Sequence, residues 1–186
     1  MNFRILPMIL TSTLPLLGAP AAQRESHAPT KAPSLEKPAL ALAFGETKTQ
    51  VFTFPNGLTL IVEENHSAPV ASVQAWCKTG SIHEGKWLGA GLSHILEHML
   101  FKGTTSRAPG VIARQVQDAG GYINAYTSND RTVYWIDVPA KGAASAVDIL
   151  ADAMMNATLH EAEYDKEQEV IRREFAMGYD NPDRTA

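Results

Sequence analysis

Cysteine is nearly absent from this chain, which has a single one, Cys77, among 186 residues. One cysteine cannot form a disulfide within the chain, so the fold must rest on a packed core or on a bound metal. Cys77 ends an apolar, strand-like segment, and we expect it to act as a small buried side chain.

The sequence also lacks an excess of positive charge. It has 16 Lys and Arg residues against 20 Asp and Glu residues, a net charge of −4 and a pI near 5.8. Proteins that bind nucleic acid usually carry a basic patch, so this balance predicts no nucleic-acid partner. The hydrophobic content of 45% and charged content of 19% are typical of a globular domain.

A long hydrophobic run is missing as well. The apolar stretch from Ile5 to Leu17 spans 13 residues, whereas a helix that crosses a bilayer needs about 20. Arg4 precedes this stretch, and Ala19-Pro20-Ala21 follows it with the small-x-small form of a cleavage site. Residues 1–21 therefore predict a signal peptide cleaved near Ala21, a secreted or periplasmic protein and no retained membrane segment.

Residues 22–48 have the composition of a linker. They are rich in Ala, Pro, Lys, Glu and Ser, with Pro29, Pro33 and Pro38 at short intervals and no apolar periodicity. We expect a disordered Pro/Ala-rich tether there, followed by one folded domain over residues 49–186.

The folded part alternates between strand-like and helix-like segments. Apolar alternation and turn signals such as Asn56-Gly57 predict strands over residues 51–54, 58–62, 70–77, 122–127 and 132–138. Helical spacing predicts helices over residues 92–101, 111–119, 142–159 and 161–178. Hairpins with segregated helices favour an α+β fold, a largely antiparallel sheet with helices packed on one face.

Two of these helices have predicted apolar stripes. We expect Val147, Leu150, Met154 and Leu159 to form the buried side of the third helix. For the fourth helix the expected apolar side consists of Tyr164, Val170, Ile171 and Phe175.

The first predicted helix carries two histidines and a glutamate in the pattern His94-Ile95-Leu96-Glu97-His98. At about 100° per residue, His94 and His98 lie about 40° apart on one face, one turn from each other, so both imidazoles can reach one ion. Glu97 borders the same face, where its carboxylate can polarise a water on the metal without being a ligand. The pattern is the His-x-x-Glu-His motif of inverted zinc peptidases.

A catalytic zinc usually has three protein ligands and one open position, so a third ligand must come from elsewhere. The fourth predicted helix offers Glu163, Glu167, Glu169 and Glu174. Glu167 and Glu174 are seven residues apart and nearly in register on one helix face, and either could turn inward. Spacing alone does not choose between them.

Four separated stretches resemble the pitrilysin/insulinase family of zinc peptidases, in particular its processing-peptidase-like bacterial members. They are Pro55-Asn56-Gly57-Leu58, the run Gly89–Thr104 around the histidines, Asn124-Ala125-Tyr126-Thr127 with Thr132-Val133-Tyr134, and the run Glu167–Glu174. The resemblance extends over about residues 49–184 and follows the family's order of motifs.

The resemblance implies a role for each site residue. His94, His98 and Glu174 would ligate one Zn²⁺ per chain, Glu97 would be the general base, and Glu167 would support the site without binding the metal. Asn124 and Ala125 would lie on an edge strand that pairs with the backbone of an extended peptide substrate. The implied activity is that of a metalloendopeptidase acting on extended peptides or unfolded protein segments.

Family members consist of two related halves, each of two domains, so the resemblance also implies a second homologous half or subunit as a partner. Residues 49–186 would be an incomplete first domain of one such half, and we expect a truncated product with weak activity. A non-catalytic, peptide-binding subunit of a two-subunit peptidase is the alternative, against which the intact motif argues. A lyase with a similar helix is a further alternative, but it needs a cysteine ligand downstream, and none follows His98.

Overall fold

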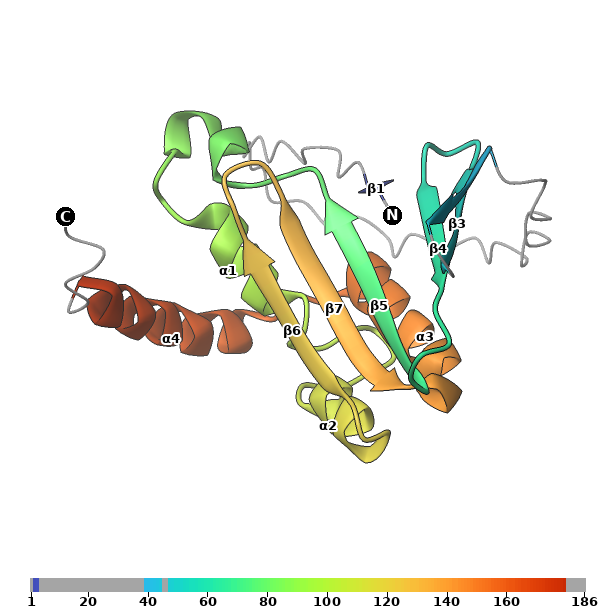
Figure 1. Ribbon diagram of the computed structural model, residues 1–186. Helices are drawn as coiled ribbons and strands as arrows, with labels where there is room; N and C mark the ends of the chain where they lie inside the picture. Colours follow the sequence, from blue (N-terminus) through green and yellow to red (C-terminus); the bar gives the residue numbers. More distant parts are fainter. Residues whose placement is uncertain (1, 4–38, 45–46, 180–186) are drawn as a thin grey trace, which may run out of the picture.

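The computed structural model describes residues 2–3, 39–44 and 47–179, and within them an α+β architecture (Figure 1). The strands are β1 (Asn2–Phe3), β2 (Leu40–Phe44), β3 (Thr47–Thr53), β4 (Thr59–Glu64), β5 (Val70–Cys77), β6 (Tyr122–Thr127) and β7 (Thr132–Pro139). The α-helices are α1 (Leu92–Met99), α2 (Val111–Asp118), α3 (Ala143–Asn156) and α4 (Glu161–Tyr179). Short 3₁₀ turns occupy Ser81–His83, Gly85–Trp87 and Ala140–Gly142.

The larger sheet has the strand order β1-β5-β7-β6. Strands β5 and β7 are antiparallel over their whole length, and β6 forms an antiparallel hairpin with β7, so β6 is an edge strand. The two residues of β1 pair in parallel with Trp76 and Cys77 at the end of β5. The rest of the predicted signal peptide lies outside the described residues.

A second, smaller sheet has the order β2-β3-β4. The predicted hairpin is confirmed: Thr53 pairs with Thr59, and Gly57 takes φ +83° in the connecting turn. The side-chain oxygen of Asn56 accepts the Leu58 N–H over 3.1 Å, which explains why Asn-Gly suits this turn. Strand β2 falls within the predicted tether, so the end of that segment is paired with β3 instead of being a linker.

Helices α1, α2 and α3 cover one face of the larger sheet, as predicted, and lie behind it in Figure 1. The core between them is apolar and consists mainly of Ala75, Cys77, Leu100, Ile112, Val116, Tyr134, Ile136, Val138, Ala146, Ile149, Leu150 and Ala153. Each large apolar side chain buried there contributes on the order of 1.5–3 kcal/mol. Burial also raises the pKa of the Cys77 thiol to about 11, consistent with the predicted inert, buried cysteine.

The predicted stripe of the third helix is wrong in two of its four positions. Val147 is 53% exposed, and Leu159 lies beyond the end of α3 with φ 47°. The buried side of α3 consists instead of Ala146, Ile149, Leu150 and Ala153. The two alanines have small side chains, which allow the helix to lie close to the sheet.

The predicted apolar side of the fourth helix is also mostly wrong. Of its four residues only Ile171 is buried, whereas Phe175 is 53% exposed. The reason is that α4 does not pack on the sheet. It projects to one side of the molecule and lies against α1 (Figure 1), where it buries Glu167 next to Ile171.

Candidate metal centre

Helix α1 is positioned by a carboxylate from the preceding loop. Its N-terminus has no local side-chain cap, because the residue before it, Gly91, has no side chain. The Ser93 N–H donates instead to Oε1 of Glu84, nine residues upstream, over 2.9 Å. Glu84 is buried, and its negative charge lies at the positive end of the helix dipole. Glu84 lies outside the periodic pattern that predicts the helix, so the sequence did not reveal this cap.

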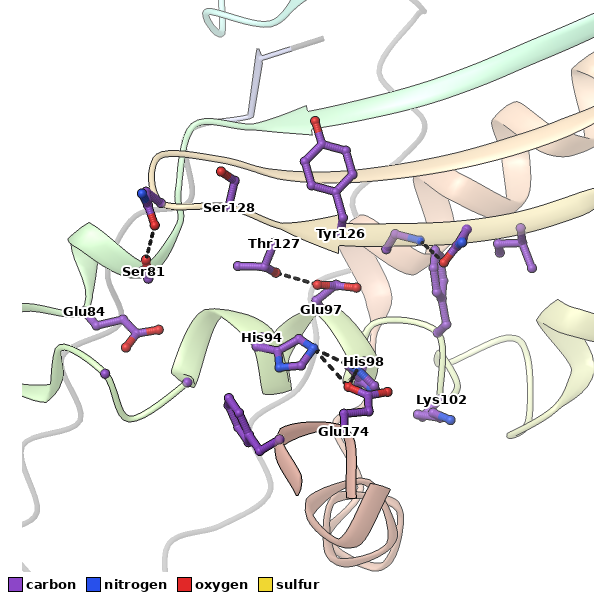
Figure 2. Close-up of a pocket in the computed structure, with 18 residues that line it drawn as sticks. Ser81, Glu84, His94, Glu97, His98, Lys102, Tyr126, Thr127, Ser128 and Glu174 are labelled. Carbon is purple, nitrogen blue, oxygen red and sulfur yellow. Dashed lines mark hydrogen bonds and ion pairs between the residues drawn. The ribbon is translucent and has the colours of Figure 1, made fainter. Parts of the chain in front are cut away.

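The predicted histidine pair is confirmed in its geometry. His94 and His98 project from the same face of α1 with their ring centroids 4.8 Å apart, and their two Nε2 atoms are separated by 3.2 Å. Both side chains line an open cleft with a volume of about 810 Å³ (Figure 2).

Helix α4 brings Glu174 to this pair. Oε2 of Glu174 lies 3.4 Å from Nε2 of His94 and 3.7 Å from Nε2 of His98. The potential ligand atoms of the three residues all lie within 4.8 Å of one another. Of the two glutamates that spacing left open, Glu174 is therefore the one that meets both imidazole Nε2 atoms.

These three atoms fit a zinc ion. Donors about 2.0–2.1 Å from a tetrahedral ion lie about 3.3 Å from one another, and the three separations here are 3.2, 3.4 and 3.7 Å. Two imidazoles and one carboxylate are also a common ligand set of catalytic zinc, with a fourth position left open. His94, His98 and Glu174 could thus hold a metal with little rearrangement.

Glu167 faces the other side of His98. Its Oε2 accepts a hydrogen bond from Nδ1 of His98 over 2.9 Å, and its Oε1 lies 2.6 Å from Nζ of Lys102. With the proton on Nδ1, the lone pair of Nε2 of His98 is free to bind a metal. A carboxylate behind a ligating histidine generally fixes the ring in this tautomer. Burial opposes ionisation of Glu167, but the bonds from Lys102 and His98 outweigh it and hold the pKa of the carboxyl below its ordinary value.

Glu97 lies beside the three potential ligands but does not belong to their cluster. It is buried, and its Oε2 accepts a hydrogen bond from Oγ1 of Thr127 over 2.5 Å (Figure 2). Thr127 ends strand β6, so the sheet edge and α1 meet at this contact. Sequence reasoning missed Thr127, and the available signal was a polar residue at the helix-facing end of a strand.

The edge strand β6 forms one wall of the cleft. Asn124 and Ala125 both line it, and the Ala125 N–H donates to the Asn124 side-chain oxygen over 2.8 Å. The predicted substrate-pairing residues therefore lie in the same cleft as the potential metal ligands, on a strand that pairs with β7 alone among the described strands. In the described part of the chain, no helix is long and apolar enough to cross a membrane.

Comparisons with known proteins identify the family. Residues 59–185 match the model of the family described as insulinase, peptidase family M16. The chain is 40% identical over 128 residues to the probable mitochondrial-processing peptidase subunit beta of Arabidopsis thaliana, covering 69% of this chain and 24% of that protein. It is 38% identical over 132 residues to the uncharacterized zinc protease YmxG of Bacillus subtilis, covering 71% and 32% of the two chains.

A solved structure is similar as well. The crystal structure of a protease from Helicobacter pylori matches with a TM-score of 0.67 and 30% identity, over 74% of this chain and 33% of that chain. The chain thus spans about a quarter to a third of the length of these relatives. Since the family match covers more than half of the chain, this protein belongs to the insulinase family, peptidase family M16.

Proposed function

We propose that this protein is a zinc-dependent endopeptidase that hydrolyses peptide bonds in extended peptides or unfolded protein segments. The observation that carries the proposal is the triangle of Nε2 of His94, Nε2 of His98 and Oε2 of Glu174, whose edges match those of a tetrahedral zinc site. The zinc protease names among its relatives support the same metal.

Glu97 is the proposed general base. Zinc, when bound, supplies a Lewis acid that polarises the substrate carbonyl and makes water more acidic. Glu97 takes the proton of the attacking water and passes it to the leaving amine. Because Thr127 occupies Oε2 of Glu97, the second oxygen, Oε1, remains available for the proton transfer.

The substrate is proposed to bind by strand addition at β6. This strand pairs with β7 on one side, and Asn124 and Ala125 on it line the cleft that also contains His94 and Glu97. A peptide held along a strand edge is recognised mainly through its backbone, so the proposal predicts extended substrates with modest side-chain preference. The Asn124 side chain must release the Ala125 N–H for that pairing to form.

The working protein is proposed to contain a second homologous half or subunit and to act in the periplasm or outside the cell. The subunit designation of several relatives supports the first point, and the apolar stretch at residues 5–17 supports the second. In the alternative, a non-catalytic peptide-binding subunit, the chain would retain the cleft, and the activity of the assembled peptidase would survive Glu97→Gln.

Peptide hydrolysis by zinc-loaded protein tests the proposal. We expect an internally quenched, extended peptide to be cleaved by the wild-type chain, slowly, and cleavage to be lost in Glu97→Gln with zinc content unchanged. Glu169→Gln on the exposed side of α4 is the matched control and should retain the wild-type rate. Equal cleavage by Glu97→Gln and the wild type would contradict the proposed chemistry.

A further inference from the structure

A buried carboxylate outside the cleft is not used by the proposed chemistry. Asp152 on α3 is 8% exposed and accepts four hydrogen bonds. The donors are Oγ1 of Thr104 at 2.6 Å, Oγ of Ser106 at 2.8 Å, Nη1 of Arg107 at 2.5 Å and Nδ2 of Asn156 at 2.8 Å. We call these five residues the Asp152 cluster.

The cluster joins two segments that lead to the metal ligands. The first segment starts at Gly103, five residues after His98. The second segment ends at Thr158, three residues before α4 begins. The backbones of the two segments are tied as well, since the Thr105 N–H donates to the Asn156 carbonyl and the Thr158 N–H to the Gly103 carbonyl, both over 3.1 Å. The chain after α1 and the chain before α4 are therefore held together at this point.

Few other contacts determine where α4 lies. The helix projects from one side of the molecule, and its main packing partner is α1 (Figure 1). Near the ligands, α4 contacts α1 and the segment after it through Phe175 beside His94 and through Glu167, which bonds Nδ1 of His98 and pairs with Lys102. Glu174 lies 13 residues into α4, so a small rotation at the start of the helix would move Oε2 of Glu174 away from both imidazoles.

We propose that Asp152 is a positioning residue of the metal site, which holds the start of α4 relative to α1 so that Glu174 can complete the ligand triangle. The inference rests on the proposed function, because it presumes zinc at His94, His98 and Glu174. Asp152 acts through the placement of α4, so its removal affects mainly the third ligand, Glu174, and to a smaller extent the bond of Glu167 to His98.

The test is a double-mutant cycle on zinc affinity, measured by competition with a chelating dye, between Asp152→Asn and Glu174→Gln. Loss of a supporting residue commonly weakens metal binding by about 10- to 100-fold, and we expect about tenfold weakening for Asp152→Asn. In the Glu174→Gln background, Asp152→Asn should have a clearly smaller effect, because only the bond of Glu167 to His98 remains to be disturbed. The visible spectrum of bound Co²⁺ should change in Asp152→Asn toward that of Glu174→Gln, because both lose the same ligand.

Two controls separate positioning from general destabilisation. Asp148→Asn removes the other carboxylate partner of Arg107, but the Asp148 side chain is mostly exposed, so zinc affinity should stay within about twofold of wild type. Protection of the buried Cys77 from a thiol reagent reports on folding in every variant. Should Asp152→Asn unfold, Ser106→Ala removes one of the four donors and should weaken zinc binding about two- to threefold.

The outcomes distinguish the inference from the function beneath it. If zinc binding needs Glu174 but is unchanged in folded Asp152→Asn, the role of Asp152 is overturned and the zinc site stands. Where Asp152→Asn unfolds, unchanged zinc affinity in Ser106→Ala leads to the same conclusion. The role of Asp152 is also overturned if Asp152→Asn lowers zinc affinity equally in the wild-type and Glu174→Gln backgrounds. A wild-type chain that binds no zinc overturns both.

Discussion

The hydroxyl of Thr127 donates to Oε2 of Glu97 over 2.5 Å and thereby joins the end of the edge strand β6 to the last turn of helix α1. As a general base, Glu97 is a carboxylate with acceptor oxygens only, so the Thr127 hydroxyl is the donor of this bond. The proposed general base is held from the strand that is proposed to bind substrate.

Thr127→Val should impair turnover without impairing metal binding. Valine keeps the branched shape but removes the hydroxyl, so Glu97 loses one hydrogen bond and gains rotational freedom. A bond to a charged group contributes on the order of 1.5–3 kcal/mol, which predicts at least about a tenfold lower kcat with KM little changed. Thr127→Ser restores the hydroxyl and should recover most of the rate. Equal kcat in the valine and wild-type proteins would show that the contact does not orient Glu97.

Glu167→Gln should weaken zinc binding although Glu167 does not belong to the ligand triangle. The charged acceptor behind Nδ1 of His98 makes the ring a better ligand, and replacing it with an amide commonly costs on the order of tenfold in metal affinity. The measurement is a zinc titration against a chelator. Glu163→Gln on the first turn of α4 is the matched control, because the Glu163 side chain pairs with Lys166 and does not belong to the ligand triangle. Unchanged zinc affinity in Glu167→Gln would show that the Glu167 carboxylate pairs with Lys102 but does not support His98 as a ligand.

Acid should destabilise the fold partly through Asp152. Burial opposes ionisation of this carboxyl, but hydrogen bonds from Thr104, Asn156, Ser106 and Arg107 outweigh it, so its pKa lies well below the ordinary value. A group with a depressed pKa stabilises the fold fully above its unfolded pKa, about 3.9 for Asp, and the stabilisation is lost as the pH falls further.

The checking measurement is urea unfolding of the metal-free protein between pH 6 and pH 3. The wild type should lose more stability over this range than Asp152→Asn, which lacks the titrating group and starts about 2–3 kcal/mol less stable at neutral pH. Asp148→Asn, whose carboxylate is mostly exposed, should follow the wild-type curve. Parallel curves for the wild type and Asp152→Asn would contradict the assignment.

Much of the fold follows from local pattern. Strand β5 occupies the predicted residues because the alternation over Val70–Cys77 separates a buried face from an exposed one. The histidine pair could be predicted for a similar reason, since the spacing of His94 and His98 on α1 alone places both on one face. Such features depend on residues close in sequence, where periodicity is informative.

The contacts that complete the site depend on how distant segments pack. Glu167 and Glu174 have nearly the same helical phase, and only the way α4 lies against α1 directs one to Nδ1 of His98 and the other to both Nε2 atoms. Asp152 illustrates the same limit: in the sequence it is a polar residue within an apolar helix, and its four donors come partly from residues 45–48 positions away. Periodicity carries no information about such pairs.

Zinc content per chain, measured by elemental analysis on the wild type and on Glu174→Gln, tests the central claim most directly. Glu169→Gln, an exposed glutamate on the same helix, serves as the matched control, and protection of Cys77 confirms that each protein is folded. The geometry predicts about one zinc per chain in the wild type and in Glu169→Gln, and much less in Glu174→Gln. A folded wild type without zinc, or a Glu174→Gln variant that retains it at wild-type affinity, would contradict the three-ligand site.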